Sequence, residues 1–189
     1  MRKVLLIIAL CAVSTFAVGQ MTFQVYTRIL EGENKKIIVE PDVNVYGQKI
    51  LDEKSGIGIW GFALVEKGWA EAYGGLLYSP AKWVEITIGA GIEQCPALYR
   101  LSANVWMGGK GFSFLLATEK GDGPDNWWYK STLKYQVKNW NLGVMSWRFH
   151  GTGPLVEYAP TKITSIWVNP VYDLEFKVSR LVVGIDIKI

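Results

Sequence analysis

The stretch that decides the fold is Arg180-Leu-Val-Val-Gly-Ile-Asp-Ile-Lys-Ile189, at the carboxyl end of the chain. Apolar residues occupy every second position from Leu181 to Ile189, and Arg180, Gly184, Asp186 and Lys188 lie among the positions between them. A period of two predicts a β-strand whose two faces meet different surroundings. Because the last residues of a soluble domain usually fray in water, an alternation that persists to Ile189 predicts a terminal strand held in an apolar environment.

The same period recurs along the chain, most clearly at 84–93, where Val84, Ile86, Ile88, Ala90 and Ile92 share one face. Short turn-forming segments separate the runs, and helical periodicity is almost absent, which predicts an antiparallel up-and-down sheet. About twelve strands are expected, or ten if residues 20–52 do not join the sheet. Their predicted ranges are 22–30, 36–46, 56–65, 69–78, 84–93, 97–107, 111–119, 126–138, 141–149, 154–159, 162–169 and 171–189.

Alternation alone does not say which face meets water. A secreted soluble barrel of the lipocalin type, which binds an apolar ligand inside, has the same pattern as a membrane barrel with its apolar face outward. Gly89, Gly91, Gly143 and Gly184 lie on the polar face, where a narrow interior needs space for long Arg, Lys and Glu side chains. Closure into a barrel also removes exposed sheet edges. These features favour an all-β transmembrane barrel.

Aromatic residues near predicted strand ends support the same fold. The chain has nine tryptophans, and an indole suits the boundary between lipid and water because it has an apolar body and a polar N–H. Those expected at this interface are Trp69, Trp83, Trp106, Trp127, Trp128 and Trp140.

The carboxyl-terminal strand resembles the closing strand of bacterial outer-membrane β-barrel proteins, on Gly184, Ile187 and Ile189. The resemblance implies a Gram-negative outer-membrane location, contact with outer-membrane lipid, and recognition of residues 180–189 by the barrel-assembly machinery. An even number of strands places both termini on the periplasmic side in such proteins.

Residues 1–19 have the features of a secretory signal peptide. Arg2 and Lys3 precede an apolar core, and Ala17-Val18-Gly19 supplies small residues for cleavage. The mature chain is then expected to be a single β-barrel domain over residues 20–189.

Removal of the signal peptide leaves 18 basic residues against 17 acidic ones. Nucleic-acid binding is not expected, because neutralising a phosphate backbone needs a strong basic excess. Cys95 is then the one cysteine left in the mature chain, so an internal disulfide is not expected.

The polar face predicts a charged lumen of mixed sign. This favours a narrow, porin-like channel or a structural barrel plugged by its own side chains, and a small solute or a lipid is left open as the ligand. The strand at 56–65 is apolar on both faces, which predicts apolar bulk in the interior or burial by another segment. The residues expected to line the lumen are Glu71, Glu85, Glu93, Arg100, Lys130, Lys134, Asp173, Glu175, Arg180 and Asp186.

Enzyme chemistry has one weak candidate. His150, the only histidine, precedes Thr152 by two residues, which resembles the spacing of histidine and nucleophilic serine in outer-membrane lipid A deacylases. The resemblance implies a lipid-modifying hydrolase, but Thr152 replaces the serine, so an enzyme is not the favoured reading. No cofactor is expected, since the glycine-rich run at 73–78 is not followed by a phosphate-binding Gly-Lys-Ser/Thr. One histidine and one mature-chain cysteine do not build a zinc site.

Overall fold

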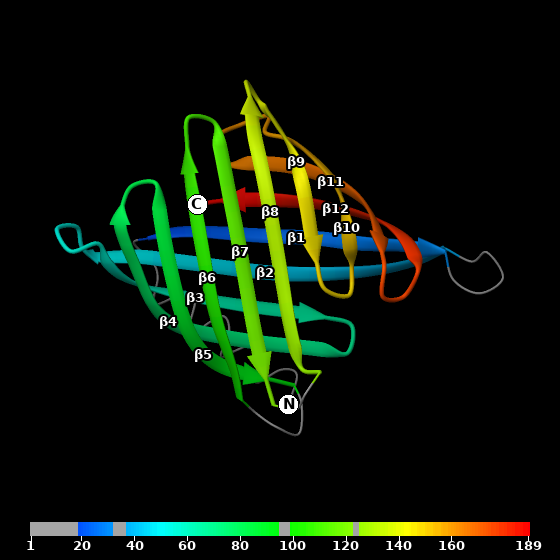
Figure 1. Cartoon of the computed structure of the whole chain (residues 1–189), viewed down its shortest axis with the longest axis horizontal. Helices are drawn as coiled ribbons and strands as arrows, with labels where there is room; N and C mark the ends of the chain where they lie inside the picture. The colour runs from blue at the N-terminus through cyan, green and yellow to red at the C-terminus, as the bar shows by residue number, and fades with distance from the viewer. Residues whose placement is uncertain (1–18, 32–36, 95–98, 123–124) are drawn as a thin grey trace.

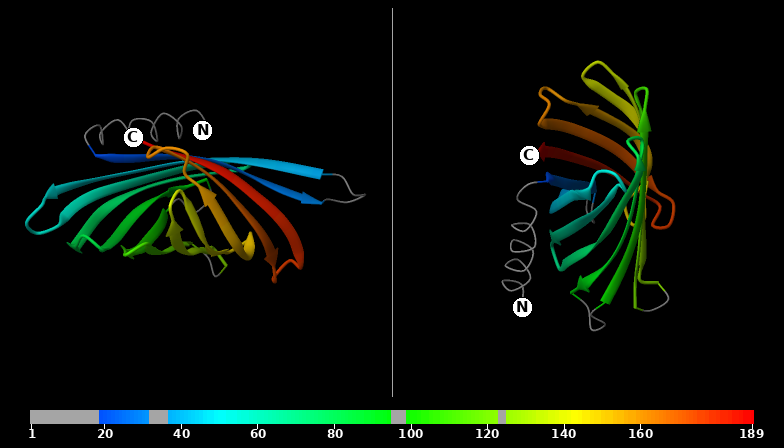
Figure 2. Two further views of the ribbon diagram at one scale, coloured as in Figure 1. Left: turned by 90° about the horizontal axis from the view of Figure 1, so that it is seen from above. Right: turned by 90° about the vertical axis from the view of Figure 1, so that its left-hand side faces the viewer.

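A computed structural model of the chain describes residues 19–31, 37–94, 99–122 and 125–189. The described residues form twelve β-strands joined into one closed antiparallel barrel, and Figures 1 and 2 show how the strands curl around a common interior. No helix in this part of the chain is long and apolar enough to cross a membrane. The strands are β1 (Gln20–Glu31), β2 (Ile37–Asp52), β3 (Ile57–Glu66), β4 (Trp69–Ala81), β5 (Val84–Glu93), β6 (Tyr99–Gly109), β7 (Phe112–Gly121), β8 (Trp127–Val137), β9 (Trp140–Trp147), β10 (Gly151–Tyr158), β11 (Thr164–Asp173) and β12 (Val178–Lys188).

Each strand pairs with its neighbour in sequence, and β1 pairs with β12 to close the sheet. Phe23 lies opposite Ile187 in this closing ladder, and the backbones of Met21 and Ile189 exchange two hydrogen bonds of 2.9 and 2.8 Å. Every residue of the carboxyl-terminal stretch therefore has a partner strand, which removes the fraying expected of a free end.

The barrel has two ends, which we call the terminal end and the loop end. The terminal end carries Gln20, Ile189 and the turns after β2, β4, β6, β8 and β10, and the loop end is the one at which the odd-numbered strands end. The turn after β6 has only two residues, Lys110 and Gly111, with φ of 51° and 86°. Positive φ at both positions matches the right-handed twist of the flanking strands, so this hairpin closes without a bulge.

The apolar face of the barrel points outward, as the sequence predicts. Ile86, Ile88 and Ile92 are exposed on β5, whereas Thr87 and Glu93, on the opposite face of the same strand, are buried. On β12 the exposed row is Leu181, Ile185 and Ile187. A soluble calyx has the reverse arrangement, with its apolar face inside. The outer apolar surface is instead suited to hydrocarbon, and the polar groups are enclosed.

The predicted strand boundary at Pro170 is wrong, because β11 runs through it to Asp173 and the chain turns at residues 174–177. Pro154 on β10 and Pro170 on β11 both lack a backbone N–H, and the β10–β11 register has no pairs between Thr152↔Tyr172 and Val156↔Val168. Asn169 bridges this gap, since its Nδ2 donates to the carbonyl oxygens of Gly153 at 3.1 Å and Pro154 at 2.8 Å. A side chain thus replaces the lost ladder bonds, and the strand continues. The predicted start of β10 at 154 is also corrected to Gly151.

One side of the interior is filled by a packed apolar cluster. Its buried members come from β1 and from β9 to β12, and they are Tyr26, Met145, Trp147, Leu155, Trp167, Val171 and Val182. A smaller cluster of Trp60, Tyr73 and Leu77 packs with Tyr46 and Phe62 on the inner face of β2 to β4. This explains the strand at 56–65: its second apolar face carries aromatic bulk into the interior, one of the two alternatives that the sequence leaves open.

Candidate functional site: the luminal cavity

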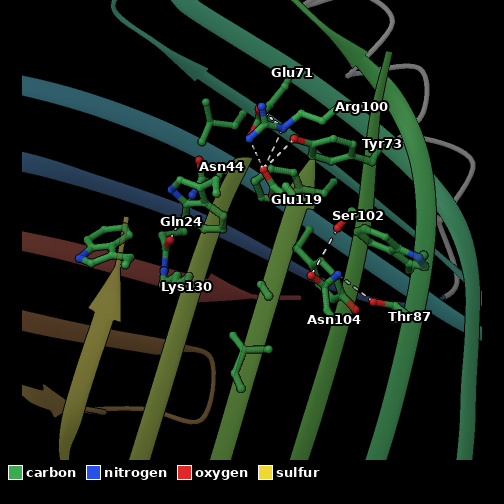
Figure 3. Close-up of a pocket in the computed structure, with 18 of the residues that line it drawn as sticks. Gln24, Asn44, Glu71, Tyr73, Thr87, Arg100, Ser102, Asn104, Glu119 and Lys130 are labelled. Carbon is green, nitrogen blue, oxygen red and sulfur yellow. Dashed lines mark hydrogen bonds and ion pairs between the residues drawn. The ribbon is translucent and has the colours of Figure 1, made fainter. Parts of the chain in front are cut away.

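The side of the interior that the large apolar cluster leaves free contains a cavity of about 920 Å³. Its lining includes Gln48 and Glu85 near the terminal end and Trp69 and Asp125 near the loop end, so it extends along the barrel from one end to the other. Figure 3 shows side chains from several neighbouring strands converging on this space. The cavity is therefore the candidate functional site.

Arg100, on β6, is the centre of a buried ion cluster near the loop end of the cavity. Its Nη1 lies 2.7 Å from Glu93 Oε2, its Nη2 lies 2.9 Å from Glu119 Oε2, and its Nε lies 3.5 Å from Glu71 Oε2. The hydroxyl of Tyr73 donates to Glu119 at 3.0 Å, as Figure 3 shows. A planar guanidinium with five N–H donors can serve several carboxylates at once, which holds the side chains of four strands in one arrangement.

A second cluster forms around Arg28, on β1. Its Nη2 lies 2.7 Å from Glu66 Oε2, 3.3 Å from Asp42 Oδ1 and 3.8 Å from Glu40 Oε2. Asp42 is fully buried, and its Oδ2 has no hydrogen-bond partner among the described residues. Both clusters place three carboxylates around one arginine, so acidic groups outnumber basic ones at this level of the lumen.

The middle of the cavity is polar but mostly uncharged. Asn104 Nδ2 donates to Thr87 Oγ1 at 2.8 Å, and Asn44 Nδ2 donates to Gln24 Oε1 at 3.2 Å. Lys130 also faces this space (Figure 3), and its Nζ lies 4.6 Å from the centre of the Trp147 ring. A cation over an indole face is stabilised by the ring quadrupole. The lining can therefore form hydrogen bonds with a hydrated solute without holding a large net charge at its centre.

Aromatic rings, and not long charged chains, occupy the space above Gly89 and Gly184 on the inner face. A Cβ on Gly184 would clash with Trp167 Cζ2, and one on Gly89 would lie 2.7 Å from Trp60 Cζ2. The Trp60 indole reaches from β3 to β5 and donates to the carbonyl oxygen of Ile88 at 3.0 Å. The expectation that Arg, Lys and Glu side chains need this room is thus corrected for Gly89 and Gly184, because flat rings lie directly on the bare backbone there.

The residues predicted to line the lumen fall into three groups. The first group lines the cavity and consists of Glu71, Glu85, Arg100 and Lys130. Glu93 is buried next to this group, where it is paired with Arg100. Inward-facing pairs beside the cavity hold Lys134 with Glu157 at 2.9 Å, Arg180 with Asp173 at 2.6 Å, and Asp186 with Gln24 at 2.8 Å. Glu175 lies in the turn after β11, where it is exposed and its Oε2 is 3.9 Å from Arg148 Nε, so it belongs to the rim of the loop end.

The six tryptophans predicted at the membrane interface are divided between two surfaces. Trp83 and Trp140 are exposed near strand ends, where lipid headgroups can reach them, and Trp127 is exposed near a strand end and also lines the cavity. Trp69 and Trp106 line the cavity, and Trp128 packs against the large apolar cluster. Because Trp69, Trp106 and Trp128 are directed inward, they are not available to an outer aromatic belt. In Trp69 the indole Nε1 donates to Glu71 Oε2 at 2.8 Å.

His150 and Thr152 are directed to different partners. The His150 ring is buried and stacks on Trp147 with 3.9 Å between ring centroids, and its Nδ1 lies 3.2 Å from the carbonyl oxygen of Arg148. Burial lowers the pKa of His150 to about 3. Thr152 is exposed, and its hydroxyl bonds that of Ser146 at 2.7 Å. A histidine that activates a hydroxyl must bond it and accept its proton, and this arrangement meets neither condition.

The described residues contain no group of three or more His, Cys, Asp or Glu side chains arranged to hold a metal ion. Cys95 lies outside the described residues.

Several residues of the site were missed by sequence reasoning, namely Arg28, Asp42, Glu66 and Glu119. Glu119 is the last residue of the predicted strand 111–119, whereas in the structure it is the eighth residue of β7 and lies opposite Trp128 in the β7–β8 register. The alternation of Gln24, Tyr26 and Arg28 on one face of β1 is the signal that could have indicated the Arg28 cluster. Its partners on β2 and β3 could be found only once the register between these strands was known.

Solved bacterial outer-membrane barrels share this fold. A structure described as a KdgM porin aligns with a TM-score of 0.59 and 12% identity over 88% of this chain and 98% of its own. Omp33 of Acinetobacter baumannii gives 0.58 and 6% identity over 90% and 98%, and outer-membrane phospholipase A of Escherichia coli gives 0.53 and 12% identity over 88% and 89%. No family model and no curated protein sequence matches the chain.

The described residues thus form a closed, twelve-stranded β-barrel with its apolar face outward, the fold of these solved bacterial outer-membrane barrels. The alignments place porins among its structural neighbours. At sequence identities of 6–12%, these alignments show a shared fold.

Proposed function

We propose that this protein is a narrow, porin-like channel of the bacterial outer membrane that admits small hydrophilic solutes. The observation that carries the proposal is the cavity, whose lining includes residues from both ends of the barrel. The shared fold with a KdgM porin supports a channel and an outer-membrane location. The barrel is oriented with its terminal end toward the periplasm, as is general for even-stranded bacterial barrels.

The side chains of the lumen favour small solutes over large ones. The large apolar cluster fills one side of the interior, so the path is confined to the side of β1 to β8. Near the loop end, the Arg28 and Arg100 clusters reach into that path from several strands. Amide and hydroxyl groups such as those of Gln24, Asn44 and Asn104 replace part of a solute's hydration shell along the way.

A substitution that fills the middle of the cavity tests the proposal. Ala117 lines the cavity on β7, between Asn104 and Lys130 in the strand register. Ala117→Trp adds an indole to the path, and we expect it to lower single-channel conductance in a planar bilayer at least about fivefold, because conductance depends on the open cross-section at the narrowest point.

The matched control is Ala103→Trp. Ala103 faces outward on β6, where an indole meets lipid and leaves the lumen unchanged. Conductance in this variant should equal that of the wild type. A wild-type barrel that inserts but carries no current would contradict the channel and support a plugged structural barrel. Equal conductance in all three proteins would contradict this cavity as the path of the solute.

A further inference from the structure

The turns at the terminal end share one chemical feature. In the described chain, these turns follow β2, β4, β6, β8 and β10, and each contains one lysine. The first four lysines are spaced 28 residues apart, so one hairpin period separates each from the next. All five are exposed. They are Lys54, Lys82, Lys110, Lys138 and Lys162, and together they are called the basic turn ring.

Exposed aromatic residues lie on the outer wall next to three members of the ring. Trp83 follows Lys82 directly and is 60% exposed. Beside Lys110, the rings of Phe112 and Tyr135 pack with their centroids 4.5 Å apart, and beside Lys138, those of Trp140 and Tyr158 lie 4.7 Å apart. Aromatic side chains of this kind mark the level at which hydrocarbon gives way to headgroups. The lysines lie in the turns, farther from the middle of the barrel than these aromatic residues, and are therefore at the level of the lipid headgroups.

The ring lysines lack carboxylate partners within the described residues, where the ion pairs involve other cations. Two acids, Asp52 and Glu53, precede Lys54 in the same turn, and the carboxylate of Asp52 accepts a hydrogen bond from Ser55 Oγ at 2.7 Å. At the loop end, Lys67 follows Glu66 directly and Lys177 follows Glu175 by two residues, whereas among the ring lysines only Lys54 has an acid this close in sequence. Four of the five ring lysines therefore have no acid within two residues in sequence, so most of the positive charge of the ring is uncompensated.

We propose that the basic turn ring binds the phosphate groups of anionic phospholipids in the leaflet at the terminal end of the barrel. Lysine side chains lay their methylene stems along apolar surface and extend the ammonium group to the headgroups. Each lysine near an anionic lipid surface adds to the attraction. The lysines follow the perimeter of the barrel, which matches a ring of lipids. A single protein partner would instead need its contacts gathered on one side.

The test measures which lipids stay with the full-length barrel after purification from vesicles of equal phosphatidylglycerol and phosphatidylcholine content. We expect the wild type to retain phosphatidylglycerol in at least about threefold excess, by lipid mass spectrometry. Replacing all five ring lysines with Gln should return the ratio to that of the vesicles, whereas five Lys→Arg replacements should keep the excess. Raised salt should reduce the excess, since it screens exposed charges.

Two double variants test whether the excess of phosphatidylglycerol depends on the ring lysines or on exposed lysines anywhere on the barrel. Lys110→Gln with Lys138→Gln removes two members of the ring, and Lys67→Gln with Lys177→Gln removes two exposed turn lysines at the loop end. Only the first pair should lower the excess of phosphatidylglycerol. Equal loss in both pairs, or an unchanged excess in the five-lysine Gln variant, would overturn the proposal. The lipid measurement does not depend on conductance, so the proposed channel and the proposed lipid contact can fail separately.

Discussion

At the scale of single residues, the interior of this barrel depends on close contact between aromatic rings and glycine. Gly184 lies directly opposite Trp167 in the β11–β12 register, and the indole covers the position that a Cβ would occupy. The same indole donates from Nε1 to Asp186 Oδ1 at 3.0 Å. A hydrogen bond and a bare backbone therefore hold Trp167 in one place, and Trp167 in turn belongs to the cluster that confines the cavity to one side.

Gly184→Ala should destabilise the barrel by about 1–3 kcal/mol, because the new methyl group forces Trp167 out of its packed position. Gly109→Ala is the matched control, since a Cβ there has nothing within 4 Å, and its effect should stay within about 0.5 kcal/mol. Urea unfolding in lipid vesicles, followed by tryptophan fluorescence, measures both. In a Trp167→Leu background the cost of Gly184→Ala should shrink, and an undiminished cost would contradict the contact as its cause.

At the scale of the element, adjacent residues of one strand face two different solvents. Ala103 on β6 is directed outward and is exposed, and Asn104, next to it, lines the cavity and donates to Thr87. Because successive side chains of a strand point to opposite faces, two adjacent residues of β6 face hydrocarbon and water, respectively.

Ala103→Lys should lower the free energy of unfolding in lipid by about 2–4 kcal/mol, the cost of a charge on the lipid face near the middle of the bilayer. Asn104→Lys, one position away, should cost less than half as much, since its ammonium group enters a polar cavity. Unfolding titrations of the two variants in the same vesicles make the comparison. If the two variants lost the same free energy of unfolding, the structure would be contradicted, because it places Ala103 against lipid and Asn104 in a polar cavity.

At the scale of the whole molecule, closure between β1 and β12 makes the sheet one cooperative unit. Every strand then has two paired neighbours, and the chain has no open edge in the described barrel. Such closure makes partial opening costly, because the first step must break an entire ladder.

The folded barrel should therefore resist detergent at room temperature. On a denaturing gel, the unheated full-length protein should migrate faster than the heated one. A chain that ends at Phe176 lacks β12 and leaves β1 and β11 without partners on one side, so its heated and unheated forms should migrate alike. If the truncated chain still showed a fast-migrating unheated band, closure would not be the source of the resistance.

Much of the fold could be predicted from the sequence because its signals are local. Period two along β5, β6 and β12 predicted strands and the outward direction of their apolar faces, and the structure confirms both. The boundary at Pro170 could not be predicted this way, because a proline normally ends a ladder and only the side chain of Asn169, bonded to β10, lets the strand continue.

The sequence by itself determined the all-β class and the alternation of an apolar with a charged face, because alternation and turn chemistry act between residues close in the chain, and it left twelve or ten strands open. Tertiary structure alone decided which inward charges meet. Arg100 joins carboxylates from β4, β5 and β7, and Trp60 reaches across β4 to Gly89, through registers that closure of the sheet sets. The physical reason is that a strand pattern specifies a face, whereas the neighbours on that face depend on the pairing of strands far apart in sequence.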